Sequence, residues 1–181
     1  MTTDYTHLNT FTVTPEDTRL MYANLPKIVH LEDPATAAMN DFATNVPLAF
    51  LRTELMMKAR RAMEAREQHF VLATDTSAQV VGVLSLKHIL GETPIKMIEE
   101  NRVVRSEVLI RNVMTPMTDI PVIDLTKLQL AKVGHILTTL EHLKSEYLLV
   151  VESLPNQDKK SLRGIFLASD LNRVLGKNKQ Y

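Results

Sequence analysis

The stretch RGIFLASDLNRVLG, residues 163–176, runs from apolar residues through a polar junction into a second apolar pattern. Three apolar residues follow Gly164, and the junction itself consists of Ala168, Ser169 and Asp170. This order predicts a short strand that leads directly into a short helix. The stretch therefore raises the question of whether its polar residues cap the helix or bind a ligand.

The physical chemistry of such a junction allows both. The first backbone N–H groups of a helix have no intrahelical partner, and together with the helix dipole they attract phosphate or carboxylate groups. A nearby carboxylate, here Asp170, suits the paired hydroxyls of a ribose, which donate hydrogen bonds to it. The alternative is that Ser169 or Asp170 only caps the helix, because both residue types are preferred there.

The junction has a counterpart earlier in the chain, and further segments align with it in the same order. The aligned pairs are GVLSLKHIL (82–90) with GIFLASDLN (164–172), HFVLAT (69–74) with YLLVVE (147–152), and AMNDFATNVPLAF (38–50) with VMTPMTDIPVID (113–124). Self-similarity in a fixed order indicates a tandem duplication. Each copy is predicted to run strand, helix, strand, turn, strand, helix.

Composition narrows the class of protein. Of 181 residues, 45% are apolar, and 21 basic residues balance 21 acidic ones, so no clustered positive charge favours nucleic acid or an anionic membrane as a partner. The absence of cysteine excludes disulfides and thiol chemistry. Residues 1–10 do not resemble a signal peptide, and no apolar run reaches the roughly 18 residues of a membrane span. We expect a cytoplasmic protein.

The repeat divides the chain into three parts. Residues 1–37 are interpreted as an N-terminal helical arm, with helix starts at Thr14-Pro15 and at Asp33-Pro34. Residues 38–103 form the first unit together with a linker helix that starts at Thr93-Pro94. Residues 104–181 form the second unit.

The predicted helix over 127–144 is apolar on more than one face. Such a helix is buried on two sides, and Gly134 would allow a neighbour to approach closely. Two interpretations remain open: an interior core helix, or a seam between subunits.

In this order, VMTPM, YLLVVE and RGIFLASD resemble the cystathionine-β-synthase-type (CBS) domain, over residues 38 to 176. MNDF, LGETPI, VMTP and RGIFLASDLNRVLG are similar to a bacterial group of stand-alone CBS-pair proteins. The resemblance implies an α/β (α+β) fold with two β-α-β-β-α units, known as a Bateman module, that forms a homodimer. It also implies two clefts between the units, which in the family often bind AMP, ADP, ATP or S-adenosylmethionine.

The family motif at the end of each unit reads Gly-apolar-apolar-Ser/Thr-x-x-Asp, where the aspartate holds ribose and the hydroxyl, with nearby backbone, holds phosphate. By resemblance, the second unit keeps Gly164 and Asp170 but has Leu167 at the hydroxyl position. Ser169 and the backbone of Ala168 are the substitutes available there.

The first unit keeps Gly82 and Ser85 but has His88 at the aspartate position. A histidine can still hydrogen-bond a ligand, and a protonated one favours phosphate; the alternative is a partly exposed helix residue. The family also builds an apolar slot for adenine, which by resemblance maps onto Met117, Ile120, Pro121 and Val122, and onto Val46 and Pro47 in the other unit.

These patterns favour a non-enzymatic regulatory module that binds an adenosine-containing ligand and requires no cofactor. No nucleophile lies beside a base in a known pattern, and the histidines lack metal-ligand spacing, so neither a catalytic nor a metal site is predicted. The alternative is an interaction scaffold with degenerate clefts, which the departures at Leu167 and His88 favour. The downstream partner is not identified.

Overall fold

The computed structural model of the chain describes residues 28–92, 95, 104–153 and 160–175. The helix starts expected at Thr14-Pro15 and Thr93-Pro94 lie outside the described residues.

Each repeat contains the predicted strands and helices. The elements of the first half are η2 (Ala35–Ala38), β1 (Asn40–Asp41), β2 (Ala49–Leu51), α1 (Met56–Ala65), β3 (Phe70–Thr74), β4 (Val80–Ser85) and α2 (Leu86–Leu90). The second half contains η3 (Arg105–Glu107), α4 (Ile110–Val113), β5 (Thr115–Pro116), η4 (Met117–Asp119), β6 (Val122–Asp124), η5 (Leu125–Leu128), α5 (Val133–Leu143), β7 (Tyr147–Ser153), β8 (Lys160–Leu167) and α6 (Ala168–Val174). We call β1 and β5 the opening strands of the repeats, and α2 and α6 their closing helices.

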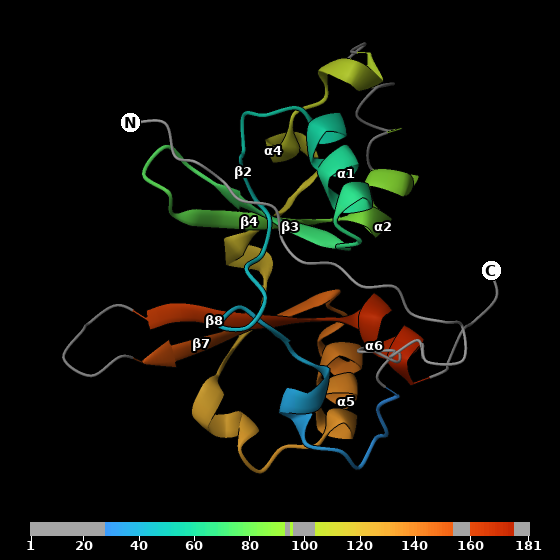
Figure 1. The fold of residues 1–181 in the computed structure, drawn as a ribbon, viewed down its shortest axis with the longest axis vertical. Helices are drawn as coiled ribbons and strands as arrows, with labels where there is room; N and C mark the ends of the chain where they lie inside the picture. The colour runs from blue at the N-terminus through green and yellow to red at the C-terminus, as the bar shows by residue number, and fades with distance from the viewer. Residues whose placement is uncertain (1–27, 93–94, 96–103, 154–159, 176–181) are drawn as a thin grey trace, which may run out of the picture.

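The strands form two four-stranded sheets that exchange their opening strands. One sheet has the order β2-β3-β4-β5 and the other the order β1-β8-β7-β6. Thus β5 of the second repeat pairs with β4 of the first, and β1 of the first repeat pairs with β8 of the second. The connection from β1 to β2 crosses from one sheet to the other (Figure 1). The predicted α+β fold with two matching units is confirmed.

A glycine permits each of these exchanged pairings. A Cβ atom on Gly164 would lie 2.8 Å from the carbonyl oxygen of Asn40, and one on Gly82 would lie 2.6 Å from that of Thr115. Real Cβ atoms do not come so close to a backbone oxygen. The glycine that begins each repeat motif is therefore needed because an opening strand passes directly over it.

The sheets stack face to face, and helices cover their outer faces (Figure 1). The core between the sheets draws on both repeats; its buried residues are Phe70, Leu72, Val83, Ile120, Tyr147, Leu149, Ile165 and Leu167. A second core lies between the first sheet and α1, α2 and α4, and a third between the other sheet and η2, α5 and α6. The repeats therefore share one interior.

The helix expected over 127–144 begins only at Val133. Leu128 belongs to η5, and Leu130 is 95% exposed outside any helix. The apolar faces of α5 are covered within the chain, by the sheet and by the segment around η2, and a Cβ on Gly134 would lie 3.3 Å from the carbonyl oxygen of Leu31. The core interpretation therefore accounts for the width of its apolar face, and the subunit seam stays a prediction.

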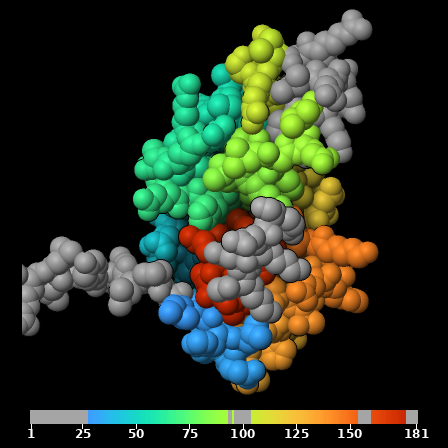
Figure 2. All heavy atoms as spheres, turned by 90° about the vertical axis from the view of Figure 1, so that its right-hand side faces the viewer, coloured from blue at the N-terminus to red at the C-terminus, as the bar shows by residue number. Residues whose placement is uncertain are grey.

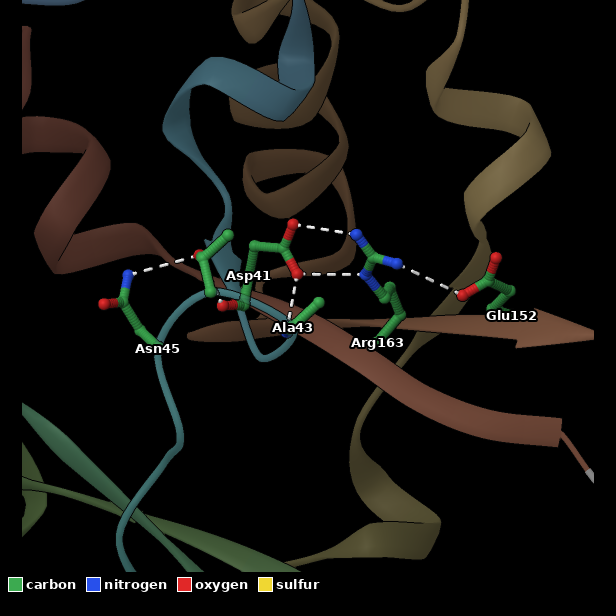
Figure 3. A network of polar contacts seen from close by, with 6 residues as sticks. Asp41, Ala43, Asn45, Glu152 and Arg163 are labelled. Atoms are coloured by element: carbon green, nitrogen blue, oxygen red, sulfur yellow. Dashed lines mark hydrogen bonds and ion pairs between the residues drawn. The ribbon is translucent and has the colours of Figure 1, made fainter.

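Arg163 of β8 binds Asp41 of β1 and so links β1 to the sheet of the second repeat (Figure 3). Two of the three guanidinium nitrogens of Arg163, Nε and Nη2, donate to the Asp41 carboxylate at 2.9 Å, and the third, Nη1, donates to Glu152 at 3.3 Å. The hydrogen bonds from Arg163 hold the pKa of Asp41 below its usual range. This paired geometry fixes the orientation of the two groups, which a single ion pair would leave free.

Candidate ligand-binding site

Asp170 lies in the first turn of α6, and its side chain reaches the first repeat. The Asp170 carboxylate accepts a hydrogen bond from Asn40 Nδ2 of β1 at 3.3 Å and lies 2.8 Å from His69 Nδ1, just before β3. Arg173 Nη2, one turn further along α6, is 3.6 Å away. Only 15% of the Asp170 side chain is exposed. The carboxylate is therefore held between the repeats rather than used as a helix cap; the N-cap residue of α6 is Leu167.

A hollow of about 100 Å³ opens beside this carboxylate. Its wall combines the opening segment of the first repeat, the start of β3 and the closing helix of the second repeat. The lining residues are Asn40, Phe42, Asn45, Pro47, Glu67, Gln68, His69, Phe70, Asp170 and Arg173. In Figure 2 the red end of the chain, which contains α6, lies directly beneath the green residues of the first repeat. Apolar rings and polar groups thus meet at the contact between the repeats.

The junction of the first repeat is built differently. Ser85 is buried and caps α2, because its side chain accepts a hydrogen bond from the His88 backbone N–H at 3.2 Å. The His88 ring meets Tyr147 of β7, with Nδ1 2.8 Å from the phenol oxygen. The side chains of Ser85 and Thr115 lie close enough to this phenol to lower its pKa, against the larger effect of burial. The predicted residues Ser85 and His88 are therefore brought together around a tyrosine of the second repeat.

Burial shifts the pKa values of this group. Loss of water raises the pKa of Tyr147 to about 12, so its hydroxyl keeps its proton at neutral pH. Loss of water also lowers the pKa of His88, which the nearby Glu146 carboxylate partly opposes. The neutral ring is thereby favoured, and its Nδ1 can accept from the phenol when Nε2 carries the ring proton.

The strand pairing corrects the alignment of the repeats by one residue. Phe70 pairs with Ser85, and Tyr147 pairs with Leu167, the residue that matches Ser85. Phe70 therefore matches Tyr147, and His69 matches Glu146 rather than Tyr147. The sequence alignment was shifted because it counted His69 as the first strand residue, whereas β3 begins at Phe70.

The remaining predicted residues fall into different surroundings. Ser169 is exposed, and the Ala168 N–H donates to the Glu146 carbonyl oxygen at 3.0 Å. Pro47 lines the hollow, whereas the neighbouring Val46 is 78% exposed. Leu167, at the family's hydroxyl position, is buried in the core between the sheets.

The apolar residues expected to form an adenine slot in the second unit lie away from Asp170. Ile120 is buried between the sheets, Met117 packs against the same core, and η4 contacts β4, the strand that carries Ser85. Pro121 is partly buried and Val122 is largely exposed. The exchange of opening strands explains this: β1 brings Asn40 to Asp170 of α6, whereas β5 lies beside β4, the strand that leads into α2.

Sequence reasoning missed His69, Asn40 and Tyr147. His69 and Asp170 are 101 positions apart, and His88 and Tyr147 are 59 apart. The available signal was a polar or aromatic residue at the start of the buried strand in both repeats. Among the described residues, no group of three or more histidine or acidic side chains is placed to hold a metal ion.

No model of a known protein family matches the chain, and no curated protein matches it. The chain is, however, similar to several solved structures. The CBS domain pair of protein MJ0100, in complex with 5′-methylthioadenosine and S-adenosyl-L-methionine, is 16% identical over 82% of this chain and 99% of its own, with a TM-score of 0.52. The CBS-pair protein CBSX2 of Arabidopsis thaliana is 16% identical over 83% and 99%, with a TM-score of 0.50. A hemolysin-like protein of Oenococcus oeni that contains a CBS domain is 12% identical over 80% and 91%, with a TM-score of 0.51.

These structures define the class of the fold. Like them, the chain has the fold of a CBS-domain pair. In the part of the chain that the structure describes, no helix is long and apolar enough to cross a membrane.

Proposed function

We propose that this chain is a regulatory module that binds an adenosine-containing ligand, namely AMP, ADP, ATP or S-adenosylmethionine, in the hollow beside Asp170. The observation that carries the proposal is the Asp170 carboxylate, 2.8 Å from His69 and only 15% exposed, at the contact between the two repeats. The adenosine compounds in the MJ0100 complex support this ligand class for a protein of the same fold.

The chemistry of the wall suggests how such a ligand is held. Ribose hydroxyls donate to Asp170 and take the place of His69 and Asn40. The adenine ring lies against the apolar rings of Phe42 and Pro47, which line the hollow. The released His69 and the nearby Arg173 carry donors suited to a phosphate or carboxylate.

The size of the hollow connects binding to signalling. At about 100 Å³ it is smaller than the roughly 300–1,000 Å³ of a typical small-molecule pocket. A nucleoside therefore enters only if the repeats move apart at this edge. Binding then favours an arrangement of the repeats that differs from the ligand-free one, and a partner protein reads that difference.

The same proposal includes a non-enzymatic role, a homodimer and a cytoplasmic location. His88 Nδ1 lies 2.8 Å from the Tyr147 hydroxyl, but Tyr147 is 1% exposed and no substrate reaches this pair. A two-fold dimer is the commonest arrangement for soluble oligomers.

A second candidate is an interaction scaffold whose clefts bind nothing. It is favoured by Leu167, which buries an alkyl group where the family has a hydroxyl, and by Tyr147, whose buried phenol lies 2.8 Å from His88 at the first-repeat junction.

Thermal melting separates the two candidates. At a hundred times its dissociation constant, a bound ligand adds roughly 2.7 kcal/mol, which raises the Tm of a chain this long by about 5–10 °C. We expect one of AMP, ADP, ATP and S-adenosylmethionine to do so. Asp170→Ala should abolish the shift, while Ser169→Ala, which changes the exposed neighbour, should keep it. If no ligand moves the Tm, the scaffold is correct.

A further inference from the structure

At the first-repeat junction, the protein itself supplies a polar group, the phenol of Tyr147, to the residues of the repeat motif. The phenol oxygen of Tyr147 lies 2.8 Å from His88 Nδ1, and Ser85 Oγ accepts a hydrogen bond from the His88 backbone N–H at 3.2 Å. Ser85 and His88 stand at the two polar positions of the repeat motif. The phenol therefore occupies the place where a ligand hydroxyl would meet the motif of the first repeat.

The second-repeat junction has no such oxygen. Strand pairing matches Tyr147 with Phe70, which lines the hollow beside Asp170. The two rings differ by a single hydroxyl. At the second-repeat junction, the Asp170 carboxylate is paired with His69 instead. The His69 side chain is 35% exposed and can rotate into solvent.

The side chains of Tyr147 and His69 differ in how easily they can leave their positions. Tyr147 is 1% exposed and packs in the core between the sheets, among Phe70, Ile120 and Leu167. To vacate its position, the ring would leave that core, and His88 Nδ1 would lose the phenol as its partner. His69 leaves its position by a side-chain rotation at the surface.

From this asymmetry we infer that Tyr147 is a permanent internal occupant of the first-repeat cleft, so that the chain takes up one ligand and not two. The ligand count rests on the proposed function above. The occupancy by Tyr147 does not, and it is tested without any nucleotide.

Replacement of the ring should create a cavity that prefers a phenol. In Tyr147→Ala, 4-methylphenol restores both the ring and the hydroxyl, whereas toluene restores only the ring. We expect 4-methylphenol to raise the Tm of this variant by several degrees more than toluene does. The matched control is Phe166→Ala, whose ring is buried among apolar residues only, and in which toluene should raise the Tm at least as much.

Equal Tm shifts with the two compounds in Tyr147→Ala, or no shift with either, would overturn the inference. If that variant does not fold, the Tm of the Tyr147→Phe variant tests the inference instead. It keeps the ring, removes one oxygen and leaves buried polar atoms unpaired, so its Tm should fall by about 5 °C. A Tm equal to that of the wild type would show that the oxygen has no such partners.

The ligand count is measured by calorimetric titration with AMP, ATP and S-adenosylmethionine. We expect one site in the wild type, and in Phe70→Tyr, which adds the same oxygen beside Asp170, an affinity at least ten-fold weaker. Two sites in the wild type, or an unchanged affinity in Phe70→Tyr, would contradict the inference. If the wild type binds none of these probes, the proposed function fails, and the phenol experiment still decides the role of Tyr147.

Discussion

Phe70 and Tyr147 hold matching positions at the starts of β3 and β7 and differ by one oxygen atom. That oxygen lies 2.8 Å from His88 Nδ1, and the His88 backbone N–H donates to Ser85 Oγ, so Tyr147, His88 and Ser85 form a closed polar group. On the other side, Asp170 has only partners at or near the surface and lines an open hollow. Two copies of one motif have thus acquired different environments through single side chains.

A pH titration tests the closed group at the level of one residue. Burial lowers the pKa of His88 below the ordinary histidine value of 6.5. The folded state therefore binds fewer protons there than the unfolded state. The stability that neutral His88 contributes is fully present above pH 6.5 and is lost as pH falls from 6.5 through the lower pKa of the folded state.

We expect the His88 Cε1 proton to titrate below pH 6.5 in a proton NMR experiment. The Tm of the wild type should decrease over this interval more steeply than the Tm of His88→Gln, which has no proton to gain. A His88 pKa at or above 6.5 would mean that the ring is hydrated and that the closed group does not exist in solution.

At the scale of elements, the exchange of β1 and β5 decides which residues meet. Each opening strand is only two residues long, and each pairs with a glycine of the other repeat. The hairpins also share one register shift at the same place, next to Gly82 and next to Gly164. At these crossing points the opening strand leaves no room for a side chain on the glycine.

Substitution of either glycine should weaken these crossings. A Cβ on Gly82 would also approach Met114 Sδ at 2.9 Å, and one on Gly164 would approach Met39 Sδ at 3.0 Å. Because the backbone oxygen beside each sulfur cannot yield without displacing its strand, Gly82→Ala and Gly164→Ala should each cost about 1–3 kcal/mol in urea unfolding.

Gly134→Ala is the control for these variants. Its Cβ would lie 3.3 Å from Leu31 O, and alanine improves the helix propensity of α5 by up to about 1 kcal/mol. Its stability should stay within about 1 kcal/mol of the wild type. Crossing-point variants as stable as this control would show that the opening strands are not pressed against the glycines.

Some of these elements could be predicted from the sequence and others could not. The duplication predicted the strands, the hairpins and the closing helices, because these depend on local patterns of apolar residues and turns. Asp170 was found because it stands in a motif. The exchange of opening strands was not predicted, because two-residue strands carry no pattern that names their partner.

The sequence could not show which of the predicted site residues lie close together, for the same reason. Val46 and Met117 were chosen by their positions within a repeat, but the clefts combine the two repeats. His69 and Tyr147 became visible only when strands far apart in the sequence were paired.

At the scale of the whole molecule, the repeats are not separate domains joined by a linker. Each sheet lacks a strand without the other repeat, and the central core takes residues from both. The chain should therefore unfold in a single cooperative transition.

Dividing the chain tests this. Neither fragment 28–95 nor fragment 104–175 should unfold cooperatively alone, as followed by circular dichroism, because each leaves one face of its sheet and one strand edge uncovered. An equimolar mixture should recover the transition. A fragment with its own sharp melting transition would show that a single repeat is an independent domain.

We propose that the ligand binds in the hollow beside Asp170, at the contact between the repeats. A crystal structure of the chain grown with AMP or S-adenosylmethionine tests it most directly. The account predicts one ligand per chain, with ribose hydroxyls within hydrogen-bond distance of the Asp170 carboxylate, His69 turned away and Tyr147 unmoved. A ligand bound beside His88, or crystals that contain neither compound, would contradict it.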